Sequence, residues 1–533
     1  MNLTALSAFE TAQKVRAGEL NANDLAEAAL AQIRAIDGVP GSLAPGILES
    51  AEEQKVHAFI QVTEELALSQ AARVDRKIAE GEEPGALAGV PVSIKDIFCV
   101  EGTTTTAASR TLANFIPPYT ATAVQRLVDA GALILGKVNL DEFTFGSSNE
   151  SSAFQPSTNN PWNTDDVPGG SSGGSAASVA AQEVALSLGT DTGGSIRQPA
   201  AFCGVVGLKP TYGRVSRLGL IAFSSSLDCV GSLSRDVRDT ALMLQVMAGS
   251  DPKDSTSSTR PVGDYLSALQ QDVKGLRIGL SPDYEAVYYP DFESGAVHSE
   301  PVQKEVRDAV LRAAETLANA GAEIIENVPM PNTRYGIPVY FVISRVEAAS
   351  NLHRFDGVKY GYRTSAEIND LNDLYRLSRG EGFGPEPKLR ILMGMYLSAA
   401  EHASNFYQKA LKVRALIRSD FENAFDPEGD YWLDALLTPS TATTAFKRNA
   451  VLGNSVLMQY SDQMTVASNH AGVPALTLPG GLDESGLPIG IQLIGSDFGE
   501  DTILRIGHAF EQLSTSETWR SEKPQVLQGE VKA

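Results

Sequence analysis

The architecture of this chain is set by residues 167–209, which read VPGGSSGGSAASVAAQEVALSLGTDTGGSIRQPAAFCGVVGLK. Two clusters of glycine and serine, at residues 169–175 and 193–195, flank an alanine-rich segment at residues 176–188 that has good helix propensity. Glycine serves where the backbone must approach another group closely or adopt dihedral angles that other residues avoid. The sequence therefore predicts that a short helix brings the two clusters face to face, each with a serine.

The second cluster offers consecutive backbone N–H groups at Gly193, Gly194 and Ser195, and the glycines carry no side chain that could block them. Such a row of donors is what an oxyanion hole requires. A serine is a weak nucleophile without a base, and none of the 6 histidines of the chain lies within either cluster. That placement weighs mildly against a serine–histidine–aspartate site, although folding could still bring a histidine to the serine.

A lysine upstream of both clusters is the other candidate base. Lys95 lies in the strand-like apolar run GVPVSIKDIF, at residues 89–98. A lysine acts as a base only when it is neutral, and lowering its pKa from ~10.4 to about 7 costs roughly 4–5 kcal/mol. Full burial produces shifts of about that size. The apolar neighbours of Lys95 therefore make it a reasonable candidate.

Three motifs together resemble the catalytic motifs of the amidase signature family: GVPVSIKD around Lys95, GGSSGGSA around Ser171 and GTDTGGSIRQPA around Ser195. The resemblance implies that Ser195 is the nucleophile that forms an acyl-enzyme, that Ser171 relays the proton, and that Lys95 is the base. It also implies a cis peptide bond between Gly170 and Ser171. The backbone N–H groups that it assigns to the oxyanion hole are those of Thr192, Gly193, Gly194 and Ser195.

Each motif also has an ordinary interpretation. A run of glycine and serine is usually a flexible linker, and a lysine in an apolar strand is more often an edge residue whose amine reaches solvent. A phosphate-binding loop would need the spacing G-x-x-x-x-G-K-[ST], which the run does not have. The occurrence of all three motifs in the order of the family favours the catalytic interpretation.

Helical patterns alternate with short apolar strand patterns along the chain. The predicted strands are at residues 89–96, 132–135 and 322–325, and the predicted helices are at residues 23–36, 66–80, 120–130, 236–248 and 302–320. Such alternation favours a layered α/β sheet. The resemblance implies the amidase signature fold, an α/β fold in which helices cover both faces of a single mixed central β-sheet.

We expect an N-terminal helical region at residues 1–80, packed on a catalytic domain at residues 81–515 with its signature core at about 85–250, and a polar tail at residues 516–533. Ser7 and Glu10 have the spacing of a capping box, and Asn21 or Asn23 can cap the second helix. The polar segment at residues 251–261 is interpreted as a crossing within one domain, because the family builds one sheet from both sides of it.

Composition excludes several classes of function. The chain has 65 acidic against 43 basic residues, a net charge of −22, which disfavours binding of RNA by this chain alone. Its 3 cysteines are too few for a disulfide framework and suit a reducing cytosol. The sequence shows no signal-peptide pattern and no run of 18 apolar residues. We therefore expect a cytoplasmic protein without a membrane segment.

Further segments, among them GLIAFSSSLD, EAASNLHRFDGVKYGYR and NHAGVPALTLPGG, resemble one branch of the family, the A subunits of the glutamyl-tRNA(Gln)/aspartyl-tRNA(Asn) amidotransferases. That resemblance implies a glutaminase that passes ammonia to a partner for amidation of Glu-tRNA(Gln) or Asp-tRNA(Asn). It implies a heterotrimer with subunits B and C, the former of which binds the mischarged tRNA and ATP with Mg²⁺, and no cofactor on this chain. The alternative is a stand-alone amidase that hydrolyses small or peptide amides with the same three residues.

A glutamine pocket needs a fixed cation for the α-carboxylate and a fixed anion for the α-ammonium, and arginine suits the carboxylate. By the resemblance these residues are Arg390, in PKLRILMG, and Asp462, in YSDQMTVASNHAG, with Tyr340 nearby. Ser147, in a polar turn before the signature, is expected to line the pocket. We expect no metal, because no His, Cys or carboxylate cluster has convincing ligand spacing. The acidic, tyrosine-bearing residues 284–300 are an insert relative to this branch, expected at the surface.

Overall fold

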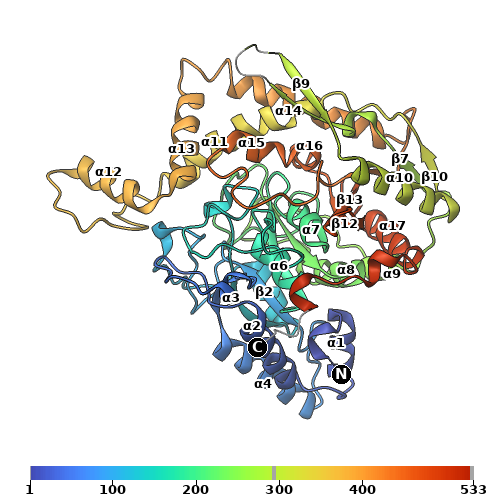
Figure 1. The fold of residues 1–533 in the computed structure, drawn as a ribbon, viewed down its shortest axis with the longest axis horizontal. Coiled ribbons are helices and arrows are strands. Elements are labelled where there is room, and N and C mark those ends of the chain that lie inside the picture. Colours follow the sequence, from blue (N-terminus) through green and yellow to red (C-terminus); the bar gives the residue numbers. More distant parts are fainter. Residues whose placement is uncertain (1, 291–293, 295, 529–533) are drawn as a thin grey trace.

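The computed structural model describes residues 2–290, 294 and 296–528, and its centre is an 11-stranded mixed β-sheet with helices on both faces (Figure 1). From one edge to the other the strands are β1 (Phe59–Val62), β3 (Leu133–Val138), β2 (Pro91–Lys95), β4 (Leu186–Asp191), β6 (Cys229–Ser234), β5 (Val206–Lys209), β12 (Ala475–Leu482), β13 (Pro488–Gly495), β11 (Ala435–Pro439), β7 (Arg277–Gly279) and β10 (Glu323–Ile325). The predicted α/β architecture is confirmed.

The sheet is parallel toward its two ends and antiparallel in its middle. β2 pairs in parallel with both β3 and β4, and β7 pairs in parallel with β10 and β11, whereas the strands from β4 to β11 pair antiparallel. Every residue of β2, β3 and β4 is buried, as expected for strands whose two faces are both covered. Lys95, the last residue of β2, therefore ends in the interior.

The predicted helix at residues 176–188 is wrong in its second half. Helix α6 (Gly173–Ala180) ends at Ala180, and Gln182 follows with a φ of 55°. Leu186 then opens β4, which pairs with β2 on one side and β6 on the other. Two ladders of backbone hydrogen bonds thus outweigh the modest helix propensity of this segment. The chain leaves β4 through residues 192–196 and enters helix α7 (Arg197–Cys203).

The other helices predicted from hydrophobic periodicity are confirmed to within about two residues, which is the ordinary uncertainty of helix ends. They are α2 (Ala22–Ile36), α4 (Glu64–Ala79), α5 (Thr122–Asp129), α8 (Val237–Met247) and α10 (Lys304–Asn319). Helix α1 (Ala8–Arg16) begins with the predicted capping box of Ser7 and Glu10. Asn21 precedes α2 but makes no capping bond with its side chain. The Asp75 carboxylate from α4 accepts the first N–H groups of α2 instead.

The C-terminal half adds helices above the sheet (Figure 1). They include α11 (Gly336–Leu352), α13 (Pro385–Ser398), α14 (Tyr407–Phe425), α15 (Ser455–Tyr460), α16 (Gln463–Ala471) and α17 (Glu500–Leu513), with α12 (Leu371–Gly382) projecting from the body. Two one-turn helices, α3 (Ser50–Glu53) and α9 (Tyr265–Ala268), complete the set. Within the described ranges no helix is both long and apolar enough to cross a membrane.

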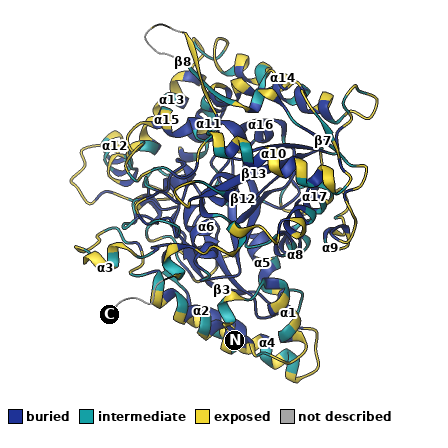
Figure 2. Cartoon of the chain, turned by 45° about the vertical axis from the view of Figure 1, so that its right-hand side comes forward, coloured by how far each residue is buried: buried dark blue, intermediate teal, exposed yellow. Residues whose placement is uncertain are grey.

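The insert at residues 284–300 forms most of a hairpin, β8 (Ala286–Pro290) and β9 (Val297–Pro301). All five residues of β9 are exposed, so the expected surface position is confirmed for that strand (Figure 2). Tyr284 differs, because it is 2% exposed beneath the hairpin. Residues 291–293 and 295 lie outside the described residues. The polar tail is described to residue 528 and contacts the body where Val526 N–H donates to the Pro161 carbonyl at 3.2 Å.

Candidate active site

The amine of Lys95 is completely buried and surrounded by hydroxyl groups. Its Nζ atom lies 2.8 Å from Ser171 Oγ, 2.8 Å from Ser172 Oγ and 2.9 Å from Thr190 Oγ1. A hydroxyl can both donate and accept a hydrogen bond. Three hydroxyls can therefore accommodate the amine in its protonated and in its neutral form, which is what a group that shuttles a proton requires.

The surroundings of Lys95 favour the neutral amine. Burial lowers its pKa to about 7, and the carboxylates of Asp141, Asp191 and Asp228 act in the opposite direction. Asp191 is itself paired with Arg197 at 2.9 Å, which neutralises much of its charge. At neutral pH a substantial fraction of the Lys95 side chains is therefore unprotonated and able to accept a proton.

The first serine cluster is held tightly around the peptide bond between Gly170 and Ser171, which is cis. Gly170 N–H donates to Gln198 Oε1 at 2.8 Å, and Gln198 Nε2 donates to the Ser147 carbonyl at 2.8 Å. A Cβ atom at position 170 would lie 2.1 Å from an oxygen of Asp141. Only glycine fits at this position, and the backbone before Ser171 is fixed from two sides.

Ser195 lies in the turn between β4 and α7 and is 4% exposed. Its carbonyl accepts a hydrogen bond from Ser172 N–H at 3.1 Å, which joins the two serine clusters directly. Its hydroxyl forms no hydrogen bond with any residue that the structure describes. The Lys95–Ser171 contact of the expected relay is thus present, whereas a hydrogen bond from Ser171 to Ser195 is not formed in this structure.

Four consecutive N–H groups point away from any backbone partner at this turn. The N–H groups of Thr192, Gly193, Gly194 and Ser195 have no acceptor in the part of the chain that is described, whereas the next one, of Ile196, donates to Asp191 at 3.2 Å. Unpaired buried N–H groups are rare in proteins. A row of them beside a serine hydroxyl is suited to an oxyanion.

The backbone of this turn is fixed by helix α16. Thr465 Oγ1 donates to the Gly193 carbonyl at 2.7 Å. Gly194 has a φ of +152°, and a Cβ atom there would lie 2.2 Å from Thr465 Oγ1. The second glycine of the cluster is therefore required both by its dihedral angle and by the close approach of α16.

A buried arginine anchors the start of α7, and the sequence interpretation did not single it out. Arg197 makes two hydrogen bonds to the Asp191 carboxylate at 2.9 Å each, and further ones to Asn469 and Gln492. Burial alone would raise the pKa of Asp191, but Arg197 holds it at about 2. The only signal for this role is the place of Arg197 in the motif GTDTGGSIRQPA, directly after the nucleophile turn.

Asp462 lies against the same turn. Its Oδ2 atom accepts a hydrogen bond from Ser147 Oγ at 2.5 Å, whereas Oδ1 is buried without a partner among the described residues. A Cβ atom at Gly194 would be 2.9 Å from that free oxygen. Burial raises the pKa of Asp462 to about 8, so a cation bound beside it would stabilise the ionised form.

Arg390 and Tyr340 lie farther along the same side. Arg390 is 1% exposed, donates from Nε to Glu386 at 2.7 Å, and stacks 5.0 Å from the ring centre of Phe145. Its Nη2 atom has no acceptor within the described chain. The Tyr340 ring covers Gly193, where a Cβ atom would lie 3.1 Å from the ring, and burial raises the pKa of its hydroxyl.

The structure thus brings Ser147, Asp462 and Tyr340 to the turn that carries Ser195. Three polar residues of the site were not found from the sequence, Ser172 and Thr190 beside Lys95, and Asp228, which accepts from Thr192 Oγ1 at 2.8 Å. All three lie inside or next to the quoted motifs. Spacing alone could not show which hydroxyl of a serine pair faces the amine.

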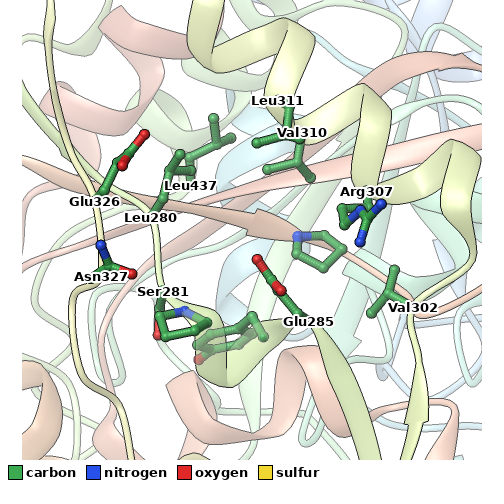
Figure 3. A pocket seen from close by; sticks show the side chains of 13 residues that line it. Leu280, Ser281, Glu285, Val302, Arg307, Val310, Leu311, Glu326, Asn327 and Leu437 are labelled. Atoms are coloured by element: carbon green, nitrogen blue, oxygen red, sulfur yellow. The ribbon is translucent and has the colours of Figure 1, made fainter.

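A separate cavity of about 250 Å³ lies beside β7 and α10, away from these residues (Figure 3). Its lining includes Leu280, Glu285, Val302, Arg307, Glu326 and Leu437. None of the expected catalytic or substrate-binding residues lines it. Among the described residues there is no group of three or more His, Cys, Asp or Glu side chains that could hold a metal ion.

The sequence model of the amidase family, described as Amidase, matches residues 47–504 of this chain. The chain is 49% identical over 512 residues to the glutamyl-tRNA(Gln) amidotransferase A subunit of Carboxydothermus hydrogenoformans, covering 96% of this chain and 98% of the relative. The crystal structure of the same subunit from Thermotoga maritima matches with a TM-score of 0.73 and 34% identity over 96% and 95% of the two chains. The native peptide amidase of Stenotrophomonas maltophilia matches with a TM-score of 0.74 and 30% identity, covering 98% of each chain.

Proposed function

The chain belongs to the amidase family, and from that premise we propose that it is the glutaminase subunit of a tRNA-dependent amidotransferase. It hydrolyses the side-chain amide of glutamine and supplies ammonia for the conversion of Glu-tRNA(Gln) to Gln-tRNA(Gln), or of Asp-tRNA(Asn) to Asn-tRNA(Asn). The observation that carries this proposal is the near full-length likeness to the A subunit of a glutamyl-tRNA(Gln) amidotransferase. The contact between Lys95 and Ser171 supports the amidase chemistry.

In the proposed mechanism Lys95, Ser171 and Ser195 act in sequence. The neutral amine of Lys95 accepts the hydroxyl proton of Ser171, and Ser171 accepts that of Ser195 as Ser195 Oγ bonds to the amide carbon. A pKa of about 7 for Lys95 supports its role as the base. The step requires the Ser195 hydroxyl to turn toward Ser171, and that hydroxyl is free of other described hydrogen bonds.

The tetrahedral intermediate places a negative charge on the former carbonyl oxygen. We assign its stabilisation to the unpaired N–H groups of residues 192–195, where removing one donor typically costs about 10²–10³ in rate. When the C–N bond breaks, the nitrogen takes a proton back from Lys95 through Ser171 and leaves as ammonia. Water then attacks the ester on Ser195 along the same proton path, which releases glutamate and restores the serine.

Glutamine is held at its α-carbon end by charges of both signs in this proposal. Asp462 binds the α-ammonium through its free Oδ1, and Arg390 binds the α-carboxylate through its free Nη2. Ser147 fixes the Asp462 carboxylate by its 2.5 Å hydrogen bond, and Tyr340 covers the turn at Gly193. Simple amides lack both charged groups and lose both of these contacts.

The partners follow from the same reasoning. We propose a cytoplasmic heterotrimer with subunits B and C, the former of which binds the mischarged tRNA and ATP with Mg²⁺. A net charge of −22 supports this division of labour, because so acidic a chain repels nucleic-acid phosphates. This chain then contributes the glutamine site and needs no cofactor for its own reaction.

Purification of the native complex tests the proposal. Ammonia release from glutamine should be detectable with the complex and should rise when ATP and mischarged tRNA are added. A stand-alone amidase would instead hydrolyse small or peptide amides at the same rate with and without the other subunits. A complex that releases no ammonia from glutamine under either condition would contradict the proposed function.

A further inference from the structure

A second buried arginine lies near the proposed glutamine pocket. Arg345 is on α11, five residues after Tyr340, and its side chain is completely buried. Its Nη1 atom donates to the Phe341 carbonyl at 3.1 Å and to Gln459 Oε1 at 3.2 Å. Its Nε and Nη2 atoms have no acceptor among the residues described. Leaving buried donors unpaired is costly, at about 1–3 kcal/mol each.

Hydrogen bonds connect Arg345 to Arg390. Gln459, which accepts from Arg345, donates to Ser455 Oγ at 3.5 Å, and Ser455 donates to Glu386 Oε1 at 2.6 Å. That same oxygen accepts from Arg390 Nε at 2.7 Å. Helices α11 and α13 are also in close contact, and the two guanidinium groups therefore belong to one buried cluster.

The cluster contains more positive than negative charge. Two guanidinium groups share the single carboxylate of Glu386, and three of their nitrogen atoms, two on Arg345 and one on Arg390, have no acceptor in the described part of the chain. Burial lowers the pKa of Arg345, and the neighbouring charge of Arg390 lowers it further. Two cations with free, planar donors are a fitting site for a carboxylate, whose two oxygens accept hydrogen bonds side by side.

A free acceptor lies at the other end of a short helix that contacts this cluster. Helix α15 carries Ser455 and Gln459, which contact the arginine cluster, and ends at Tyr460. Asp462 follows two residues later, with its Oδ1 unpartnered among the described residues and against the turn at Gly194. Unpartnered donors and an unpartnered acceptor are thus joined by one short helix, which matches a ligand that carries both a carboxylate and an ammonium group.

We propose that Arg345 is a second substrate-binding arginine, which binds the α-carboxylate of glutamine together with Arg390. This inference rests on the proposed glutaminase function and deepens it, because it makes the α-carboxylate a shared ligand of α11 and α13. The residues that precede Arg390 on its own helix, Lys388 and Leu389, are exposed. A second buried cation therefore has to come from another helix, and Arg345 provides it.

The consequence is strict selectivity for amides that carry an α-carboxylate. Without that anion, two buried cations face each other with one carboxylate between them. An amide that lacks the carboxylate, such as 4-aminobutanamide, gains nothing from either arginine and should bind weakly. Removing Arg345 should therefore weaken glutamine binding and leave the binding of 4-aminobutanamide unchanged.

The test is steady-state kinetics of the Arg345→Met variant in the purified complex, with glutamine and with 4-aminobutanamide as substrates. We expect KM for glutamine to rise about tenfold to a hundredfold, the range of a lost charged hydrogen bond, with little change for 4-aminobutanamide. Arg235→Met is the matched control, because Arg235 is a buried arginine that donates to backbone carbonyls far from the site. It should change KM for neither substrate.

An unchanged KM for glutamine in Arg345→Met, or an equal rise for both substrates, would make Arg345 a packing residue and overturn the inference. If Arg345→Met does not fold, Arg345→Lys serves in its place. It keeps the charge but loses the planar pair of donors, so KM should rise for glutamine alone, and an unchanged KM would overturn the inference. A wild-type complex inactive on glutamine would instead overturn the proposed function, which separates the two failures.

Discussion

At the scale of single residues, the chemistry depends on a few side chains that the sequence motifs name and on neighbours that they do not. The apolar run around Lys95 correctly predicts a buried amine, because no residue of β2 is exposed. The same reasoning could not find Thr190, whose hydroxyl reaches the amine only because β4 pairs beside β2. Contacts between strands depend on pairing, which a single sequence does not display.

Replacing Lys95 with methionine tests the proposed base. We expect kcat/KM for glutamine to fall about 10²–10⁴-fold, the usual contribution of a general base. Because burial lowers the pKa of Lys95 to about 7, wild-type kcat/KM should rise about tenfold per pH unit below pH 7 and level off above it. The residual activity of the variant should lack this rise.

The matched control is Lys209→Met, since Lys209 is equally buried but donates to the carbonyls of Pro210 and Val473. It should keep the wild-type pH profile, and thermal melts of both variants will separate activity from folding. Normal turnover by Lys95→Met, or a variant that keeps the rise below pH 7, would mean that another group is the base.

Replacing Asp462 with asparagine tests the proposed ammonium site. The change removes the negative charge opposite the substrate but keeps the shape, so KM for glutamine should rise about tenfold to a hundredfold. Glutaramic acid, which lacks the α-amino group, has no charge to lose there and should show little change. Equal effects on both substrates would make Asp462 a structural residue.

At the scale of elements, periodicity predicts long amphipathic helices well and short buried strands poorly. Helix α10 is found within two residues of its prediction because apolar residues recur on one face over more than four turns. The run that becomes the start of β4 follows directly on an alanine-rich helix, and an apolar run this short fits a buried helix as well as a strand. The pairing of β4 with β2 and β6 decides the outcome.

The turn between β4 and α7 is expected to tolerate no side chain at Gly194. A Cβ atom there would lie 2.2 Å from Thr465 Oγ1, at a φ of +152°. Gly194→Ala should displace the N–H groups of the turn and lower kcat/KM by roughly 10²-fold or more. Kinetics with glutamine, together with a thermal melt, measure the effect.

Gly486→Ala is the matched control for this change. Gly486 also has a positive φ, +83°, but its added Cβ would have nothing within 4 Å. The control should lose about 1–2 kcal/mol of stability from backbone strain and keep its activity. If Gly194→Ala behaves like the control, the turn does not form the oxyanion hole.

At the scale of the whole molecule, the single mixed sheet was predictable only through the resemblance. Its middle joins segments far apart in the chain, such as β5 to β12, where Lys209 pairs with Ala475. The sheet also continues across the polar segment at residues 251–261, with β6 before it and β7 after it. Composition alone suggested a boundary there. The division of the chain at residues 80 and 515 stays a prediction.

A buried pair of carboxyl groups links the N-terminal region to the sheet and should make stability depend on pH. Asp37 and Glu183 are both completely buried. Burial and the neighbouring Asp37 raise the pKa of Glu183 well above its usual value, and burial raises that of Asp37 to about 7. The folded state therefore holds protons that the unfolded chain releases above about pH 4.

Because the folded pKa values are raised, the contribution of this pair to stability should be greatest at low pH and fall as pH rises toward 7, by up to roughly 1.4 kcal/mol per pH unit for each group. Glu183→Gln removes one carboxyl and its repulsion, so its stability should fall less between pH 5 and pH 8. Denaturant unfolding at both pH values measures this. The control Glu315→Gln changes an exposed residue of α10 and should behave like wild type. Parallel curves for all three proteins would contradict the account.

The hydroxyl that becomes acylated is the most direct test of the site as a whole. Wild-type complex mixed with glutamine and quenched in acid within milliseconds should yield, by peptide mass spectrometry, a γ-glutamyl ester on Ser195, and the Ser195→Ala variant should yield none. An ester on Ser171 or Ser172, or undiminished ammonia release by Ser195→Ala, would contradict the assignment of Ser195 as the nucleophile.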